Sequence, residues 1–209
     1  TGFRPRLLFW LGAIAQEEAV VSWASETVTR YAEDPSSVDP ALARVAVLIK
    51  AKNGDESLFV QFVAAFETAD DPTARGIYLR ALGGFDDPQI REKALAYILQ
   101  GPLRSNEIFQ ISNQIRTSDK GADLVFDWLT TNYGVITSRM PPIWLPFLPI
   151  AGNGCNLQRL EKAKTFFAQP EVQVDGTVKQ MEKVEAGVLD CVGLRIREGG
   201  KVQSYLHNL

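Results

Sequence analysis

The stretch Ala69–Gln100, ADDPTARGIYLRALGGFDDPQIREKALAYILQ, decides the fold of this chain. It contains the same helix-start signal twice, at Asp70-Asp71-Pro72 and at Asp86-Asp87-Pro88. An Asp side chain can accept hydrogen bonds from the free amides of a first helical turn, and proline there sacrifices no hydrogen bond. Gly83-Gly84 can end the first helix in the left-handed conformation. The stretch therefore predicts two short helices joined by a tight turn as an αα-hairpin, the unit of a helical-repeat protein.

The rest of the chain continues this helical pattern, because apolar residues recur every three or four positions between turn signals. The further helices are expected at residues 17–32, 40–49, 55–66, 107–116, 119–138, 157–168 and from 174 onward. The only alternating fragment, residues 172–174, is too short for a strand. We predict an all-α fold, a right-handed stack of antiparallel helix hairpins that resembles HEAT-type arrays, with about ten helices. Residues 1–209 would form a single domain, with residues 1–69 as a sub-bundle.

The composition is that of an ordinary soluble globular protein, since 45% of the 209 residues are hydrophobic and 22% are charged. A net charge of −3 creates no positive field that would attract nucleic acid. No apolar run reaches the roughly 18 residues of a membrane-spanning helix. We therefore expect neither nucleic acid nor a membrane as a partner. The chain opens on Thr1 without an initiator Met, so we expect a piece of a longer protein, either cytoplasmic or periplasmic.

The two cysteines are Cys155, in the loop Gly152–Asn156, and Cys191, in a helical segment. Two cysteines define neither a disulfide framework nor a zinc site. We favour two free thiols. The alternative is a single bridge between the loop and the last helix, which an oxidising compartment would support.

Residues that could carry chemistry are few. The one histidine, His207, lies near the C-terminus, whereas a zinc site or a catalytic triad needs a histidine held in a packed site. The acidic pairs fall at helix starts, where capping explains them. We therefore predict no catalytic and no metal-binding residues. Four arginines near helix ends are either solvated or able to meet a peptide carboxylate on a concave face: Arg75, Arg80, Arg116 and Arg139.

Three segments, in order, resemble the C-terminal helical domain of M1-family zinc aminopeptidases. The first is residues 70–99, where Leu79–Gly83 matches a helix that ends in Leu-Arg-Ala-Leu-Gly. The second is GADLVFDWLTTNYGVITSR at residues 121–139, with its Trp and its Asn-aromatic pair. The third is NLQRLEKAKTFFA at residues 156–168. The resemblance covers most of residues 40–209, and the closing segment around Gly199-Gly200 and Tyr205 departs from it.

The resemblance implies a parent enzyme, which we expect to be bacterial, that removes N-terminal residues from peptides. In that family a His-Glu-x-x-His helix and a Gly-x-Met-Glu-Asn strand do the chemistry, and neither motif occurs here. This chain would form a HEAT-like bowl that encloses the peptide chamber and controls access to it. It would contain no cofactor itself, zinc being expected in the missing catalytic domain. Its partners would be that domain and the peptide substrate, and Arg116, near a chamber-lining position of relatives, would be a substrate-binding residue.

Two other functions are compatible with the residues. A free-standing helical-repeat scaffold that binds a protein partner would need polar outer faces at both ends. The segment Phe3–Leu11 is instead strongly apolar, which packing inside a larger parent explains more easily. The second alternative is an all-α enzyme that uses carboxylates. If the aminopeptidase interpretation holds, we expect an exposed apolar patch where the catalytic domain docks.

Overall fold

The structure is a computed structural model that describes residues 2–208, and all regular secondary structure in this range is helical. The all-α prediction is therefore confirmed. The chain divides into two compact units, Thr1–Ile115 and Arg116–Leu209, which we describe separately. The sub-bundle boundary predicted at residue 69 lies inside the first unit, and the single-domain organisation stays a prediction. No helix of the described range has the length and apolar character to cross a bilayer.

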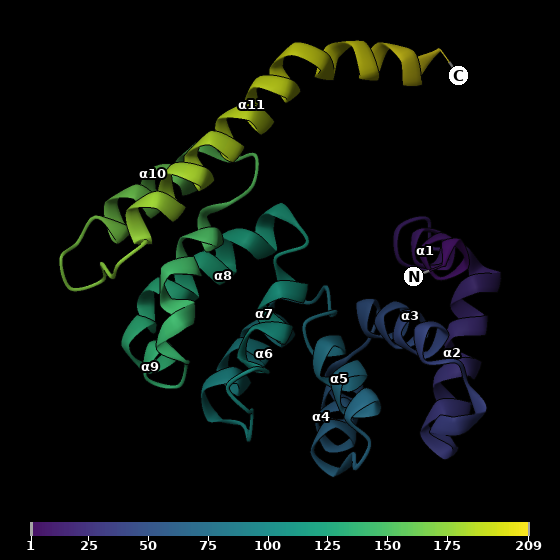
Figure 1. Cartoon of the computed structure of the whole chain (residues 1–209). Coiled ribbons are helices and arrows are strands. Elements are labelled where there is room, and N and C mark those ends of the chain that lie inside the picture. The colour runs from purple at the N-terminus through teal and green to yellow at the C-terminus, as the bar shows by residue number, and fades with distance from the viewer. Residues whose placement is uncertain (1, 209) are drawn as a thin grey trace. The chain divides into compact units, whose positions relative to one another are not determined.

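The first unit is a series of helices in which neighbours along the chain lie side by side (Figure 1). Its elements are α1 (Phe3–Phe9), η1 (Trp10–Ile14), α2 (Glu18–Glu33), η2 (Pro35–Ser37), α3 (Pro40–Lys52), α4 (Glu56–Thr68), α5 (Pro72–Ala81), α6 (Pro88–Gln100) and α7 (Ile108–Ile115). Consecutive helices pair as α2 with α3, α4 with α5, and α6 with α7. This is the stacked-hairpin arrangement expected of a helical repeat.

The doubled helix-start signal works as predicted. The Asp71 carboxylate accepts from the amide of Ala74 at 2.7 Å, and the Asp87 carboxylate accepts from the amide of Gln89 at 2.8 Å. Proline occupies the first turn in both helices. Local capping chemistry therefore begins α5 and α6 where the sequence places their starts.

The predicted pairing of these two helices, and the conformation of the turn between them, were wrong. The structure pairs α4 with α5 and α6 with α7, so the turn after α5 connects two successive hairpins instead of closing one. Gly83 and Gly84 do not adopt a positive φ, which among the described glycines is found at Gly154 and Gly176. Glycine is needed at position 83 for close approach, because a Cβ there would collide with the backbone carbonyl oxygen of Ile111 in α7.

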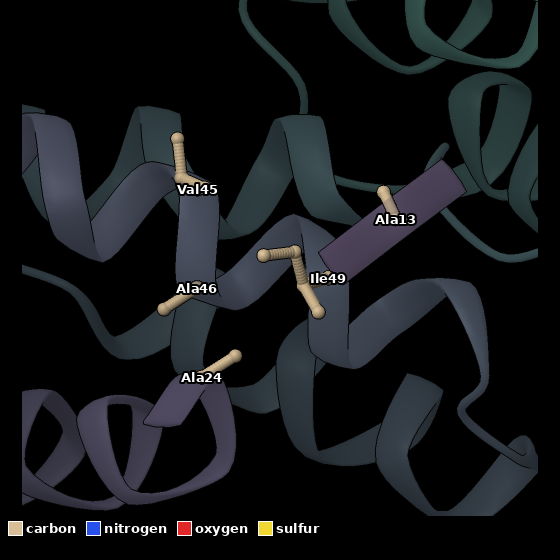
Figure 2. Packing of buried hydrophobic residues seen from close by; sticks show 5 residues of the cluster. All are labelled: Ala13, Ala24, Val45, Ala46 and Ile49. Carbon is tan, nitrogen blue, oxygen red and sulfur yellow. The ribbon is translucent and has the colours of Figure 1, made fainter. Parts of the chain in front are cut away.

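Small side chains bring α2, α3 and η1 together at the start of the chain. Ala13, Ala24 and Ala46 are buried beside Val45 and Ile49, and Figure 2 shows these side chains at the crossing of the elements. Alanine at such positions allows helix axes to approach closely because little side-chain volume separates them. Further along, α4 supplies the bulkier aromatic core, where rings at residues 59, 62 and 66 are buried.

The second unit consists of α8 (Asp119–Thr131), α9 (Tyr133–Ser138), η3 (Pro142–Gly152), α10 (Leu157–Phe167) and α11 (Thr177–His207). The segment expected as one helix over 119–138 is two helices, which meet at Asn132. The side chain of Asn132 donates to the carbonyl oxygen of Trp128 at 2.9 Å. The proline-containing segment η3 packs against α8, α10 and α11, and α10 also packs on α11.

Candidate functional site

The candidate site lies in the second unit, around the loop that leads from η3 into α10. Arg116 begins this unit, and its Nη2 donates to the carbonyl oxygen of Ile150 at 2.6 Å. The side chain is half-buried. Burial lowers the pKa of Arg116, and the neighbouring positive charge of Arg159 lowers it further. Since no salt bridge in the described part of the chain includes Arg116, its charge is not neutralised by a carboxylate there.

Arg159 is the second cation of the site, and the sequence analysis did not single it out. It is only 2% exposed although it lies in the first turn of α10. Its Nη1 forms a salt bridge with Asp123 of α8, and its Nη2 donates to the carbonyl oxygen of Asn153 at 2.9 Å. Its Nε is buried without a hydrogen-bond partner in the described residues. The guanidinium therefore joins α8, α10 and the loop.

Two neighbouring residues make room for this guanidinium and orient it. Gly154 has a φ of +132°, and a Cβ at this position would collide with Nη2 of Arg159. Asn156 caps α10, because its side-chain oxygen accepts from the amide of Arg159 at 3.1 Å. The amide group of Asn156 also donates to Asp123 at 3.2 Å. The local signal that could have revealed the buried arginine is this combination of a loop glycine and a capping Asn.

A disulfide ties the same loop to the last helix. Cys155 and Cys191 are bridged, with their Cα atoms 5.2 Å apart. This separation lies in the usual range for a disulfide. Our preferred prediction of two free thiols was therefore wrong, and the alternative of a single bridge is what forms. The cysteines are 36 residues apart in sequence, and they meet because η3 and α10 both pack against α11.

The site has an excess of positive charge, and the element η3 that binds Arg116 also has exposed apolar side chains. Asp123 is the one carboxylate that the described residues pair with either Arg116 or Arg159, and its side chain is 46% exposed. On η3, the large apolar side chains Ile143 and Phe147 are 73% and 55% exposed. Such an arrangement can bind a carboxylate through charge-assisted hydrogen bonds and an apolar side chain beside it.

The other candidates from the sequence take structural roles or remain at the surface. Arg75 is held inside the first unit by Glu107, with Nε 2.8 Å from Oε1, so it is not free to meet a peptide carboxylate. Arg80 and His207 are exposed, and Arg139 ends α9. Over residues 2–208, no three His, Cys, Asp or Glu side chains lie close enough together to hold a metal ion.

Comparison with known proteins gives consistent relatives, all of them aminopeptidases. The chain is 25% identical over 171 residues to the alanine/arginine aminopeptidase of Saccharomyces cerevisiae, an alignment that covers 78% of this chain and 20% of that protein. It is 25% identical over 174 residues to aminopeptidase 2 of Candida albicans, covering 78% of this chain and 18% of the relative. Thus the chain spans about a fifth of the length of the curated relatives it matches.

These relatives are fungal, and the expected bacterial source stays a prediction. The resemblance to aminopeptidase C-terminal domains, which the order of the sequence motifs indicated, is confirmed by a match to a family model over most of the chain. Residues 1–185 match the model of the ERAP1-like C-terminal domain, and the chain belongs to this family.

Proposed function

We propose that this chain is the non-catalytic C-terminal domain of an M1-family zinc aminopeptidase, where it encloses the peptide chamber and controls access of substrate. The observation that carries the proposal is the extent of the family match. It covers residues 1–185 of the chain, yet the chain corresponds to only about a fifth of each aminopeptidase relative. The zinc and the residues that activate water would then belong to the remaining part of the enzyme. A helical wall excludes bulk water and limits which substrates enter.

The arginine pair supports a role in holding peptide. Arg116 is positioned by its hydrogen bond to Ile150, and it has an uncompensated charge next to Arg159. A peptide carboxylate or a backbone carbonyl oxygen can accept from such a guanidinium, and a charge-assisted hydrogen bond of this kind is worth about 1.5–3 kcal/mol. We therefore assign Arg116 as the substrate-binding residue of the chain.

An exposed apolar stripe supports docking of a catalytic domain on the first unit. Phe3, Leu7, Trp10 and Ile14 follow helical spacing, and they are 79%, 43%, 58% and 56% exposed. A contiguous apolar stripe of this kind marks an interaction surface more often than a solvated one. A free-standing scaffold would instead carry a polar outer face at this end. The stripe therefore favours packing within a larger enzyme.

The test compares long and short substrates in an enzyme that contains this chain. Because Arg116 would contact peptide beyond the cleaved residue, Arg116→Ala should raise KM for peptides by roughly tenfold or more. Hydrolysis of a single aminoacyl anilide should change little, since that substrate is too short to reach the wall. Arg80→Ala is the matched control, because Arg80 is an exposed arginine in the other unit. Equal effects of Arg116→Ala on long and short substrates would contradict the assignment.

The isolated chain provides an independent test. Purified in the presence of zinc, it should not hydrolyse peptides or aminoacyl anilides, and measurable turnover that survives further purification would overturn the proposal. The coding sequence that precedes Thr1 also distinguishes the alternatives. A His-Glu-x-x-His motif upstream supports the aminopeptidase, whereas a start codon directly before Thr1 supports the free-standing scaffold.

A further inference from the structure

The segment at residues 150–156, which is the end of η3 and the loop that leads into α10, binds both arginines of the candidate site through its backbone and through the capping residue of α10. Arg116 donates to Ile150 near the end of η3, and Arg159 donates to Asn153, the first residue after η3. Asn156 at the end of the segment caps α10 and contacts Asp123, the carboxylate partner of Arg159. Any displacement of the loop therefore changes the positions of the two guanidinium groups.

The loop is fixed by packing on one side and by the disulfide on the other. Gly152 is buried, and a Cβ there would lie 2.7 Å from the Cβ of Ala163, so the backbone at this point is pressed against α10. After the buried Gly152 the chain becomes more exposed, and Gly154 is at the surface. Cys155 follows directly, and its bond to Cys191 is the covalent connection between this loop and α11.

Helix α11 provides a rigid anchor for that bond. Val184 and Val188 of α11 are buried against Leu160 of α10, about two turns and less than one turn before Cys191. Both cysteines are half-buried, and the rate of thiol–disulfide exchange depends on such access to the sulfur atoms. The bridge thus joins a helix that is packed on α10 to the loop that contains the exposed Gly154.

We propose that the Cys155–Cys191 bridge is a redox-sensitive tether that sets the position of the segment at residues 150–156 and, through it, the orientation of Arg159 and Arg116. A small dithiol supplies two electrons and two protons. The sulfur–sulfur bond breaks, both cysteines become thiols, and the dithiol is oxidised to its own disulfide. In an oxidising compartment the loop is held, and in a reducing one it is released. The consequence for peptide binding rests on the function proposed above, whereas the consequence for the loop does not.

Hydrogen exchange of the whole chain, followed by mass spectrometry, tests the effect on the loop. The informative amides are those of Asn153, Arg159 and Leu160, which donate to Ile150 and Asn156 in the oxidised protein. After dithiothreitol treatment they should exchange at least about fivefold faster, because the opening that exposes them becomes easier. Peptides from α5 and α7 in the other unit should be unaffected and serve as the internal control.

A double variant, Cys155→Ser with Cys191→Ser, separates the bridge from other effects of the reductant. It should show the fast exchange with and without dithiothreitol. Unchanged exchange in a wild-type sample whose two cysteines are fully alkylated after reduction would overturn the tether. Two alkylated cysteines in protein purified without any reductant, under air, would overturn it as well.

The peptide KM of the parent enzyme distinguishes this inference from the proposed function. If reduction loosens the loop and raises the peptide KM as Arg116→Ala does, the tether controls the site. If the loop loosens and KM stays constant, control of the site is refuted while the loop measurement stands. If Arg116→Ala itself leaves the peptide KM unchanged, the proposed substrate contact fails independently of the disulfide.

Discussion

Glu107→Gln tests the buried ion pair between Glu107 and Arg75 in the first unit. Glu107 is 6% exposed, and its carboxylate accepts from Nε of Arg75 at 2.8 Å and from Nη2 at 3.1 Å. It also accepts from the amide of Arg104 at 2.8 Å. Arg75 stacks over the ring of Phe66, with its Cζ 3.9 Å from the ring centroid, and donates to the Phe66 carbonyl oxygen at 3.1 Å. One side chain of α5 therefore connects α4 with the segment that enters α7.

The expected loss follows from the two charge-assisted hydrogen bonds between Glu107 and Arg75. At roughly 1.5 kcal/mol each, removing the carboxylate charge costs about 3 kcal/mol of unfolding free energy. This agrees with the lower end of the cost of breaking one partner in a buried pair, about 3–5 kcal/mol. Glutamine keeps the volume of glutamate, so a cavity does not contribute to the change.

The loss should also depend on pH in a defined direction. Burial alone would raise the pKa of Glu107, but the hydrogen bonds from Arg75 and from the Arg104 amide lower it on balance. A carboxyl whose folded pKa is depressed stabilises the protein above its unfolded pKa, and this stability disappears as pH falls through the folded pKa. The unfolding free energy of the wild-type protein should therefore exceed that of Glu107→Gln by the full amount above about pH 5. The difference between the two should shrink as the pH is lowered further.

Urea unfolding at pH 7 and at pH 3.5, followed by circular dichroism, measures the effect. Hydrogen exchange of peptides from α5 and α7 assigns the transition to the first unit. A difference below about 0.5 kcal/mol at pH 7 would place the variant among ordinary surface substitutions and refute the reasoning. An undiminished difference at the acidic pH would refute the assigned role of the charge.

Two further substitutions test close packing and the covalent tie. Gly83→Ala should destabilise the first unit by about 1–3 kcal/mol in urea unfolding, because the added Cβ collides with the α7 backbone. Gly76→Ala in α5 is the matched control: its Cβ meets no atom within 4 Å, so it should be neutral or stabilising by up to about 1 kcal/mol. The Cys155→Ser, Cys191→Ser double variant should lower the unfolding free energy of the second unit by about 4 kcal/mol, given a sequence separation of 36. The estimate would be contradicted if reduction lowered the unfolding free energy of the wild-type protein while the double variant remained as stable as the oxidised wild-type protein.

The parts of the fold that sequence predicts are those that depend on neighbours along the chain. Asp71 and Asp87 cap their helices because the accepting oxygen and the donating amides lie within three residues of one another. The pairing of α5 with α4 instead of α6 depends on contacts between helix faces. The residues around Gly83 do not indicate which of the two helices α5 will pair with. The same glycine is compatible with a left-handed turn and with a close helix contact, and only the position of α7 decides between them.

In the candidate site, too, the features that depend on residues distant in sequence could not be predicted. The sequence placed Arg116 among four arginines near helix ends, and only the resemblance to a family singled it out. Arg159 was missed, because a single arginine on an amphipathic helix has the sequence signature of a solvated residue. Its burial depends on Asp123, which precedes it by 36 residues, and on the carbonyl oxygen of Asn153. The six consecutive positions Gly-Cys-Asn-x-x-Arg contain the glycine that leaves space for the guanidinium, the cysteine of the disulfide, the residue that caps α10 and the buried arginine. Each of these residues has an ordinary explanation alone, and they are connected only because α8 supplies the carboxylate and α11 supplies the second sulfur.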